Sequence, residues 1–202
     1  ICLTGFKWIA KMIIDYPELE FIGGGEESFG YMVGDFVRDK DAITASLLAC
    51  EIATYAKSQG SSFYEELLKL YTEHGFYKEH LISITKKGMD GAAQIKQMMI
   101  DLRTSPMTEI DGEKVKYAFD YESSVRKNLL TGEETTIDLP KSNVLIFLTE
   151  NGTRIAARPS GTEPKIKFYF STNTPLDKTE NAAATENILD RKIERIIKEL
   201  SL

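Results

Sequence analysis

Residues 158–165 read Arg-Pro-Ser-Gly-Thr-Glu-Pro-Lys, and they connect the last two of a series of strand candidates. These candidates are short and are separated by turns: residues 115–119, 144–148, 153–157 and 165–170. The Asn151-Gly152 pair between two of them is a strong hairpin signal. One amphipathic helix begins near Asn181 and runs to the end of the chain. The pattern predicts an α+β domain over residues 106–202.

The residue types in this loop are suited to phosphate binding. The Arg158 guanidinium is a planar fork that pairs bidentately with phosphate oxygens. The hydroxyls of Ser160 and Thr162 add donors, and Gly161 frees backbone N–H groups to point at an anion. Two flanking prolines stiffen the loop, which lowers the entropy lost on binding. The alternative is an ordinary hairpin loop with an exposed arginine.

Residues 1–105 have a different character. Helical patterns cover residues 4–14, 41–59, 62–74 and 91–102, whereas the strand candidates are residues 19–22 and 80–85. In the second helix, we expect these apolar side chains to be buried: Ile43, Leu47, Leu48, Cys50, Ile52 and Tyr55. A sheet with so few strands is a poor independent folding unit. We therefore expect an incomplete α/β portion that ends at the polar, proline-bearing segment 104–106.

A second candidate site is the glycine-rich segment 23–30, Gly-Gly-Gly-Glu-Glu-Ser-Phe-Gly. It matches neither a P-loop nor the dinucleotide-binding fingerprint. Two carboxylates and a hydroxyl stand among residues with almost no side chain, so a ligand can approach the backbone closely. Carboxylates accept hydrogen bonds from vicinal sugar hydroxyls. The segment therefore indicates a sugar site, or else a tight turn with solvated acids.

Charge and cysteine content restrict the partners and the compartment. The net charge is −6, from 31 acidic and 25 basic side chains, which argues against a nucleic-acid or membrane-surface binder. The two cysteines have no partners at metal-ligand spacing, and Cys50 is interpreted as a buried free thiol. A cytoplasmic location is expected. Because the chain begins with Ile1, we expect a fragment or a processed chain.

The two loops together resemble those of the α-D-phosphohexomutase superfamily, the phosphoglucomutase/phosphomannomutase type. Residues 25–30 are similar to its sugar-binding loop, and residues 158–164 are similar to the phosphate-binding loop of its last domain. The segments 4–9 and 38–41 are similar to stretches that flank the sugar loop in that family. The resemblance implies an incomplete third α/β domain over residues 1–105. It also implies that residues 106–202 are the fourth domain, an α+β (TATA-binding-protein-like) fold.

The resemblance also implies roles for individual residues. Glu26 and Ser28 would bind the O3 and O4 hydroxyls of the sugar, with Lys40 and Lys7 reaching the same site. Lys40 is otherwise a solvated lysine before a helix that Asp41 caps. The phosphate would be held by four residues of the second loop: Arg158, Ser160, Gly161 and Thr162.

In this family a phosphoserine exchanges a phosphoryl group between the C1 and C6 oxygens of a hexose, through a bisphosphorylated sugar. The phosphoserine loop and the aspartate-rich Mg²⁺ loop are both absent from this sequence, so no catalytic or metal-binding residue is expected here. The resemblance implies that Mg²⁺ binds the N-terminal domains of the same protein and that glucose 1,6-bisphosphate is the activating intermediate. The intact protein would be an intramolecular phosphotransferase, and this fragment alone would be inactive.

Two other functions stay open. The chain could be a stand-alone module that binds sugar phosphates without catalysis, or a structural protein that has kept the loops as relics. Within the mutase reading, the sequence does not distinguish glucose, mannose and pentose phosphates, and it does not indicate the oligomeric state.

Overall fold

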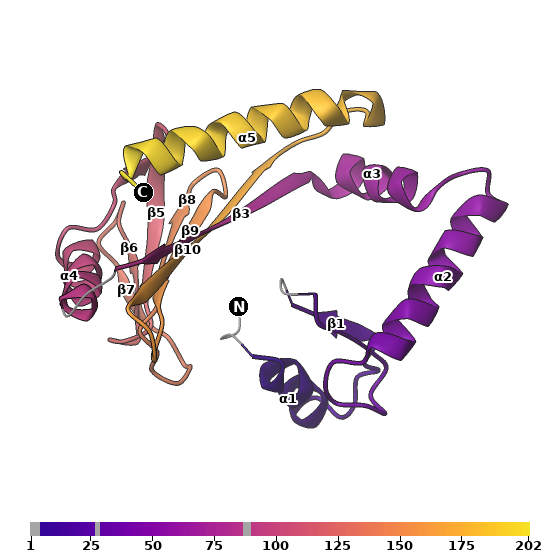
Figure 1. Ribbon diagram of the computed structural model, residues 1–202, viewed down its shortest axis with the longest axis horizontal. Coiled ribbons are helices and arrows are strands. Elements are labelled where there is room, and N and C mark those ends of the chain that lie inside the picture. The colour runs from indigo at the N-terminus through magenta and orange to yellow at the C-terminus, as the bar shows by residue number, and fades with distance from the viewer. Residues whose placement is uncertain (1–4, 27–28, 87–89) are drawn as a thin grey trace. The chain divides into compact units, whose positions relative to one another are not determined.

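The computed structural model describes residues 5–26, 29–86 and 90–202, and the chain forms two compact units, residues 1–67 and 68–202 (Figure 1). Each unit contains one of the two loops singled out by the sequence. The third helix, α3 (Phe63–His74), begins in the first unit and ends in the second. Among the described residues, no helix is both long and apolar enough to span a bilayer.

The first unit contains two helices and a two-stranded antiparallel sheet. The two strands lie between the helices in the sequence. Its elements are α1 (Lys7–Asp15), β1 (Gly23–Gly25), β2 (Tyr31–Val33) and α2 (Ala42–Ser58). The predicted strand at residues 19–22 is displaced, because the strand forms over the glycines themselves. Glycine is required at position 24, where an added Cβ would lie 2.5 Å from the Ile9 Cγ2 atom of α1. This close approach packs α1 against β1.

Helix α2 begins and ends where the sequence predicts. The Asp41 carboxylate accepts a 3.0 Å hydrogen bond from the Ile43 N–H, as an N-cap does, and Gly60 with φ +69° follows the helix. The prediction that its apolar side chains are buried is wrong. Leu47 is 60% exposed, and Cys50, interpreted as a buried thiol, is also exposed. The physical reason is the size of the sheet, because two strands of three residues cannot cover a helix of 17 residues.

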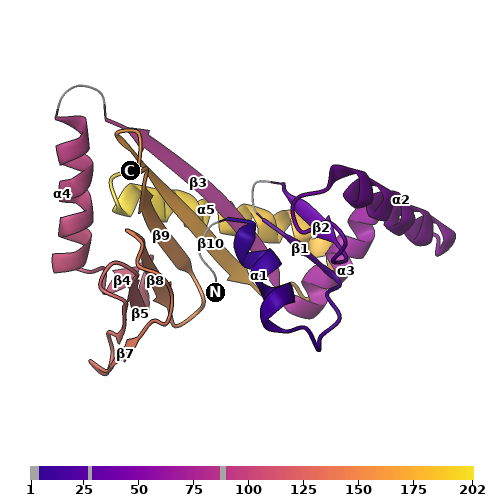
Figure 2. The ribbon, with the colours of Figure 1, turned by 90° about the horizontal axis from the view of Figure 1, so that it is seen from below.

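The second unit is built on an eight-stranded antiparallel sheet with the strand order β3-β10-β9-β8-β5-β6-β7, and β4 pairs with β5. The strands are β3 (Phe76–Thr85), β4 (Glu109–Ile110), β5 (Glu113–Asp120), β6 (Val125–Asn128), β7 (Glu134–Thr136), β8 (Leu145–Thr149), β9 (Arg154–Pro159) and β10 (Lys165–Thr174). The helices are α4 (Gly91–Thr104), the 3-10 turn η1 (Thr179–Asn181) and α5 (Ala182–Glu199). Figure 2 shows β3 and β10 running side by side as the two longest strands. The predicted β8–β9 hairpin is confirmed, with Gly152 at φ +91° in its turn.

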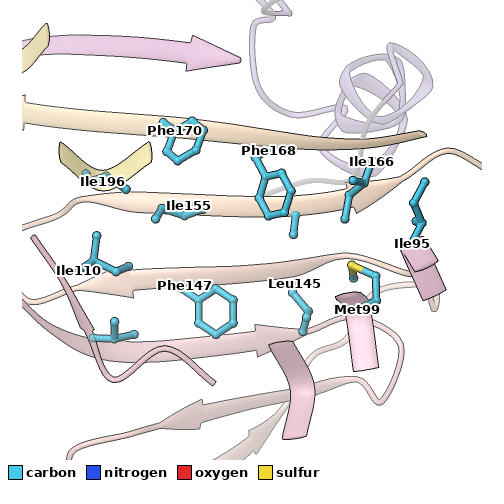
Figure 3. Close-up of a cluster of buried hydrophobic side chains, with 12 residues drawn as sticks. Ile95, Met99, Ile110, Leu145, Phe147, Ile155, Ile166, Phe168, Phe170 and Ile196 are labelled. Carbon is cyan, nitrogen blue, oxygen red and sulfur yellow. The ribbon is translucent and has the colours of Figure 1, made fainter. Parts of the chain in front are cut away.

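The core of this unit lies between one face of the sheet and the helices. Figure 3 shows Ile95 and Met99 of α4 and Ile196 of α5 packed against side chains of the central strands. The strand residues of this cluster include Phe147, Ile155, Ala157, Ile166, Phe168 and Phe170. Since side chains alternate along a strand, the residues between them point to the opposite face of the sheet. Arg158 and Lys167 lie on that opposite face.

Elements from both sides of residue 105 contribute to this one unit. β3 pairs with β10 over ten residues, and α4 packs into the same core, although both precede residue 106 in the sequence. The boundary between residues 105 and 106 therefore does not separate compact units in the structure. Its use as a boundary between family domains stays a proposal.

A partly buried ion pair joins α5 to the sheet. Lys192 of α5 donates a hydrogen bond to Glu113 at the start of β5, and both side chains are only 13% exposed. The Thr149 hydroxyl, at the end of β8, donates a second hydrogen bond of 2.7 Å to Glu113. Burial by itself would raise the pKa of Glu113, but the hydrogen bonds from Lys192 and Thr149 outweigh it, and the pKa lies below its usual value.

This arrangement predicts an acid-sensitive contribution to stability. A carboxyl group whose pKa is lowered on folding stabilises the fold above its unfolded pKa of about 4.3, and the contribution is lost as the pH falls through the folded pKa. Glu113→Gln removes this titration. We therefore expect the midpoint of thermal unfolding to fall less between pH 7 and about pH 3 for this variant than for the wild type. Equal shifts in both proteins would contradict the role of Glu113.

Candidate functional site

The first candidate site is the five-residue connection between β1 and β2. Gly25 pairs with Tyr31 across the hairpin, and the Glu26 N–H donates a 3.0 Å hydrogen bond to the Gly30 carbonyl. Phe29 has φ +65° and its side chain is 87% exposed. The backbone is therefore held in a narrow loop with Glu26 at its base. Ser28, predicted to bind the sugar with Glu26, lies outside the described residues.

The structure brings Lys40 to this loop. The Asp41 N–H donates a 2.8 Å hydrogen bond to the Tyr31 carbonyl, which places the segment before α2 beside β2. A Cβ added to Gly30 would lie 2.4 Å from Lys40 Cδ and 2.8 Å from Glu26 Oε1. Both side chains therefore pass over Gly30, and only glycine leaves them room there.

The charges around Gly30 are complementary. Lys40 donates a 2.9 Å hydrogen bond to Asp39, which raises the pKa of Lys40, and the Glu26 carboxylate adds to the effect. The Lys40 ammonium also lies 5.1 Å from the centre of the ring of Phe6, which is buried. The Lys40 ammonium is a donor and the Glu26 carboxylate is an acceptor, and both lie over Gly30. Together they can bind hydroxyl groups, which both donate and accept hydrogen bonds.

Lys7 is placed differently. It is the first residue of α1, and its ammonium lies 5.5 Å from the centre of the Trp8 ring. No described contact joins Lys7 to Glu26 or Lys40, so its role at the sugar site stays a prediction.

The second candidate site is the β9–β10 connection in the second unit. Arg158 and Pro159 end β9, and Lys165 begins β10. The loop is closed by a 2.7 Å hydrogen bond from the Ser160 N–H to the Lys165 carbonyl. It is also tied to the end of β3, because the Lys86 N–H donates a 2.9 Å hydrogen bond to the Pro164 carbonyl. The loop thus rests on three adjacent strands.

Ser160 shapes the inside of this loop. Its hydroxyl oxygen accepts long hydrogen bonds from the N–H groups of Thr162, at 3.4 Å, and Glu163, at 3.3 Å. Gly161, between Ser160 and Thr162, has open space where a Cβ would stand: among the described residues, no atom outside Gly161 and its two chain neighbours lies within 4 Å of that position. A small anion can therefore reach the backbone at Gly161 without displacing protein atoms.

The sheet adds cations to the loop. Lys167 pairs with Arg158 between β10 and β9 and with Ser83 between β10 and β3, so these three residues form one row on the face of the sheet opposite α4 and α5. Cross-strand partners have Cβ atoms about 5 Å apart, and like charges placed directly opposite repel each other. An anion bound between Lys167 and Arg158 would interact favourably with both charges. Lys165 lies on the same face, two residues before Lys167.

Comparison with known proteins identifies the chain. A family model described as phosphoglucomutase/phosphomannomutase, alpha/beta/alpha domain III, matches residues 2–71, and one for the C-terminal domain matches residues 103–189. The chain belongs to the phosphoglucomutase/phosphomannomutase family. The first match contains the Glu26 loop and the second contains the Arg158 loop. The predicted order of a third α/β domain followed by the C-terminal domain of this family is confirmed.

Several phosphoglucomutases are close relatives. The chain is 41% identical over 172 residues to the phosphoglucomutase of Staphylococcus haemolyticus (strain JCSC1435) and 41% identical over 174 residues to that of Staphylococcus aureus (strain MRSA252). These matches cover 85% and 86% of this chain but 31% of each relative. The chain therefore spans about a third of the length of the curated phosphoglucomutases that it matches.

A solved structure shows the same fold. The open form of the Paramecium phosphoprotein pp63/parafusin, a phosphoglucomutase, matches with a TM-score of 0.58 at 20% identity. The match covers 96% of this chain and 33% of that protein.

The sequence alone did not single out Lys167, which the structure places opposite Arg158. The signal that could have found it is the alternation of side chains along the strand. Ile166 and Phe168 are buried, so Lys167 points to the opposite face of the sheet, together with its cross-strand partner. The identity of that partner depends on the β9–β10 register. Within the described parts of the chain, no group of three or more His, Cys, Asp or Glu side chains could hold a metal ion.

Proposed function

We propose that this chain supplies sugar and phosphate recognition in a phosphohexomutase that interconverts hexose 1-phosphate and hexose 6-phosphate. The observation that carries the proposal is the β9–β10 loop, where an unobstructed glycine stands beside a hydroxyl, a guanidinium and two lysines on one face of a rigid sheet. Membership of the phosphoglucomutase/phosphomannomutase family supports it.

The proposal divides ligand binding between the two loops. Arg158, Ser160, Gly161 and Thr162 hold the phosphate that is not being transferred, and we add Lys167 to them. Glu26, Ser28, Lys40 and Lys7 hold the hydroxyls of the sugar.

This division leaves the phosphoryl transfer itself to other parts of the protein. We propose that a phosphoserine and the residues that hold Mg²⁺ lie in the N-terminal domains, and that the reaction passes through glucose 1,6-bisphosphate. In this proposal the residues of the present chain bind and orient the sugar phosphate. Without the nucleophile the chain alone should not turn over sugar phosphates.

The exposed apolar side chains of α2 support the proposal that its α/β/α domain is larger in the full-length protein. Ile43, Leu47 and Tyr55 are each at least 60% exposed on one helix. We propose that further strands of the α/β/α domain cover them in the full-length protein. Its free, exposed Cys50 thiol is compatible with the proposed location in the reducing cytoplasm.

The direct test is a coupled mutase assay of the full-length protein with glucose 1-phosphate, mannose 1-phosphate and ribose 1-phosphate side by side. Turnover of at least one hexose 1-phosphate is expected, and the ratio of the three kcat/KM values identifies the substrate. Saturable sugar-phosphate binding without turnover of any of them would instead favour a non-catalytic binding module.

Replacing Glu26 by glutamine in the full-length protein is expected to lower kcat/KM about tenfold or more in both directions, because it weakens a charge-assisted hydrogen bond to a sugar hydroxyl. Glu20→Gln, at another exposed acid of the same unit, is the matched control and should leave kcat/KM unchanged. If kcat/KM fell in only one direction of the reaction, Glu26 would not bind the same sugar hydroxyls in both directions.

Replacing Gly161 by alanine separates binding from folding. Since the added methyl meets no atom of the residues that the structure describes beyond its chain neighbours, the midpoint of thermal unfolding should not change. The methyl would stand where the phosphate approaches the backbone, so we expect affinity for inorganic phosphate to fall about tenfold, or about 1.4 kcal/mol. Unchanged affinity would exclude phosphate from the Gly161 side of the loop.

A further inference from the structure

An ion pair lies inside the β9–β10 loop itself. Lys165 Nζ is 3.4 Å from Glu163 Oε2, and the two side chains are 33% and 63% exposed. The backbone of Lys165 is fixed on both sides, because its N–H donates to the Glu163 carbonyl and its carbonyl accepts from the Ser160 N–H, each at 2.7 Å. The backbone at the base of the Lys165 side chain is therefore held in place, and its ammonium contacts the Glu163 carboxylate.

This pair stands where the phosphate is proposed to bind. Ser160 Oγ accepts from the Glu163 N–H, so the hydroxyl that shapes the loop also positions the residue carrying the carboxylate. Lys165 projects on the same face of the sheet as Lys167 and Arg158. An incoming phosphate and the Glu163 carboxylate would therefore compete for the same ammonium.

Replacing the Glu163 carboxylate by a phosphate at Lys165 should cost the protein little free energy. Exposed ion pairs contribute little to stability, and a lysine ammonium is a point charge on a flexible stem that can turn from one anion to another. A phosphate carries more negative charge than a carboxylate, and the Glu163 side chain is exposed enough for water to solvate it once it is released.

We propose that Glu163 is a built-in competitor of the phosphate ligand, and that Lys165 leaves Glu163 to bind the phosphate. The inference rests on the proposed function of this loop. Because of this competition, the native chain should bind phosphate more weakly than a chain with the same cations but without the Glu163 carboxylate. The carboxylate also gives Lys165 a partner when the phosphate leaves, which favours release.

The test is a double-mutant cycle on inorganic phosphate binding, measured by NMR titration of this chain at a fixed ionic strength of about 0.15 M. The variants are Glu163→Gln, Lys165→Met and the two together. Glu180→Gln is the matched control, because Lys178 and Glu180 form a similarly spaced exposed pair at 3.7 Å outside the loop. It removes the same charge without touching the site.

We expect Glu163→Gln to strengthen phosphate binding about three- to fivefold, the range of an exposed ion pair, and Glu180→Gln to change it less than about twofold. Lys165→Met should weaken binding, and in its background Glu163→Gln should have almost no effect. The proposal would be overturned if Glu163→Gln did not raise the phosphate affinity. It would also be overturned if the same rise occurred in the Lys165→Met background, because Glu163 would then act by simple repulsion of the phosphate. Absence of phosphate binding by the wild type would instead refute the proposed function of the loop, and the inference with it.

Discussion

Replacing Lys192 by methionine is expected to destabilise the second unit by about 2–4 kcal/mol, close to the cost of breaking a buried ion pair. Methionine keeps most of the aliphatic stem but removes the ammonium. The Glu113 carboxylate, only 13% exposed in side-chain area, would then keep the Thr149 hydroxyl as a donor and lose its counter-charge. The measurement is the free energy of unfolding in urea at pH 7.

Lys198→Met is the matched control, because Lys198 is an exposed lysine on the same helix and should change stability by less than about 0.5 kcal/mol. The double variant Glu113→Gln/Lys192→Met should lose less than the sum of the two single losses, since it leaves no unpaired charge. A loss below about 0.5 kcal/mol for Lys192→Met would show that the pair is effectively solvated.

Replacing Arg158 by alanine is expected to weaken phosphate binding by about 2 kcal/mol or more, or about 30-fold in Kd. A guanidinium can provide two parallel hydrogen bonds to phosphate oxygens, and alanine can provide none. Arg158→Lys should give an intermediate loss, because it keeps the charge and removes the planar fork.

Arg154 provides the control for charge. It lies on the same strand and the same face, where it pairs with Ser171, four residues before Arg158. Arg154→Ala should therefore leave the phosphate Kd nearly unchanged. Equal losses for the two variants would indicate a general effect of positive charge and would remove Arg158 from the site. Thermal unfolding of each variant separates binding losses from losses of structure.

Local features of this fold could be predicted from the sequence. Asp41 was predicted to cap α2 and does so, and Asn151-Gly152 was predicted to turn the chain between β8 and β9. In both cases the deciding interaction joins residues close together in the chain. The same holds for the two loops, whose residue types are adjacent in the sequence.

Long-range features could not be predicted in this way. The pairing of β3 with β10 joins residues about 90 positions apart, and it determines both the extent of the second unit and the position of Lys86 beside the loop. The register that sets Lys167 opposite Arg158 is likewise a property of the assembled sheet. The exposure of Leu47 and Cys50 depends on how much sheet faces α2, which the helix pattern does not contain.

We propose above that the β9–β10 loop binds the phosphate group of a sugar phosphate. It is tested most directly by NMR titration of the ¹⁵N-labelled chain with glucose 6-phosphate, with glucose as the ligand that lacks the phosphate. We predict saturable shifts of the backbone amides of Ser160, Gly161 and Thr162 with glucose 6-phosphate and with inorganic phosphate, and none there with glucose. Amides in this loop that do not respond to either phosphate compound would contradict the account.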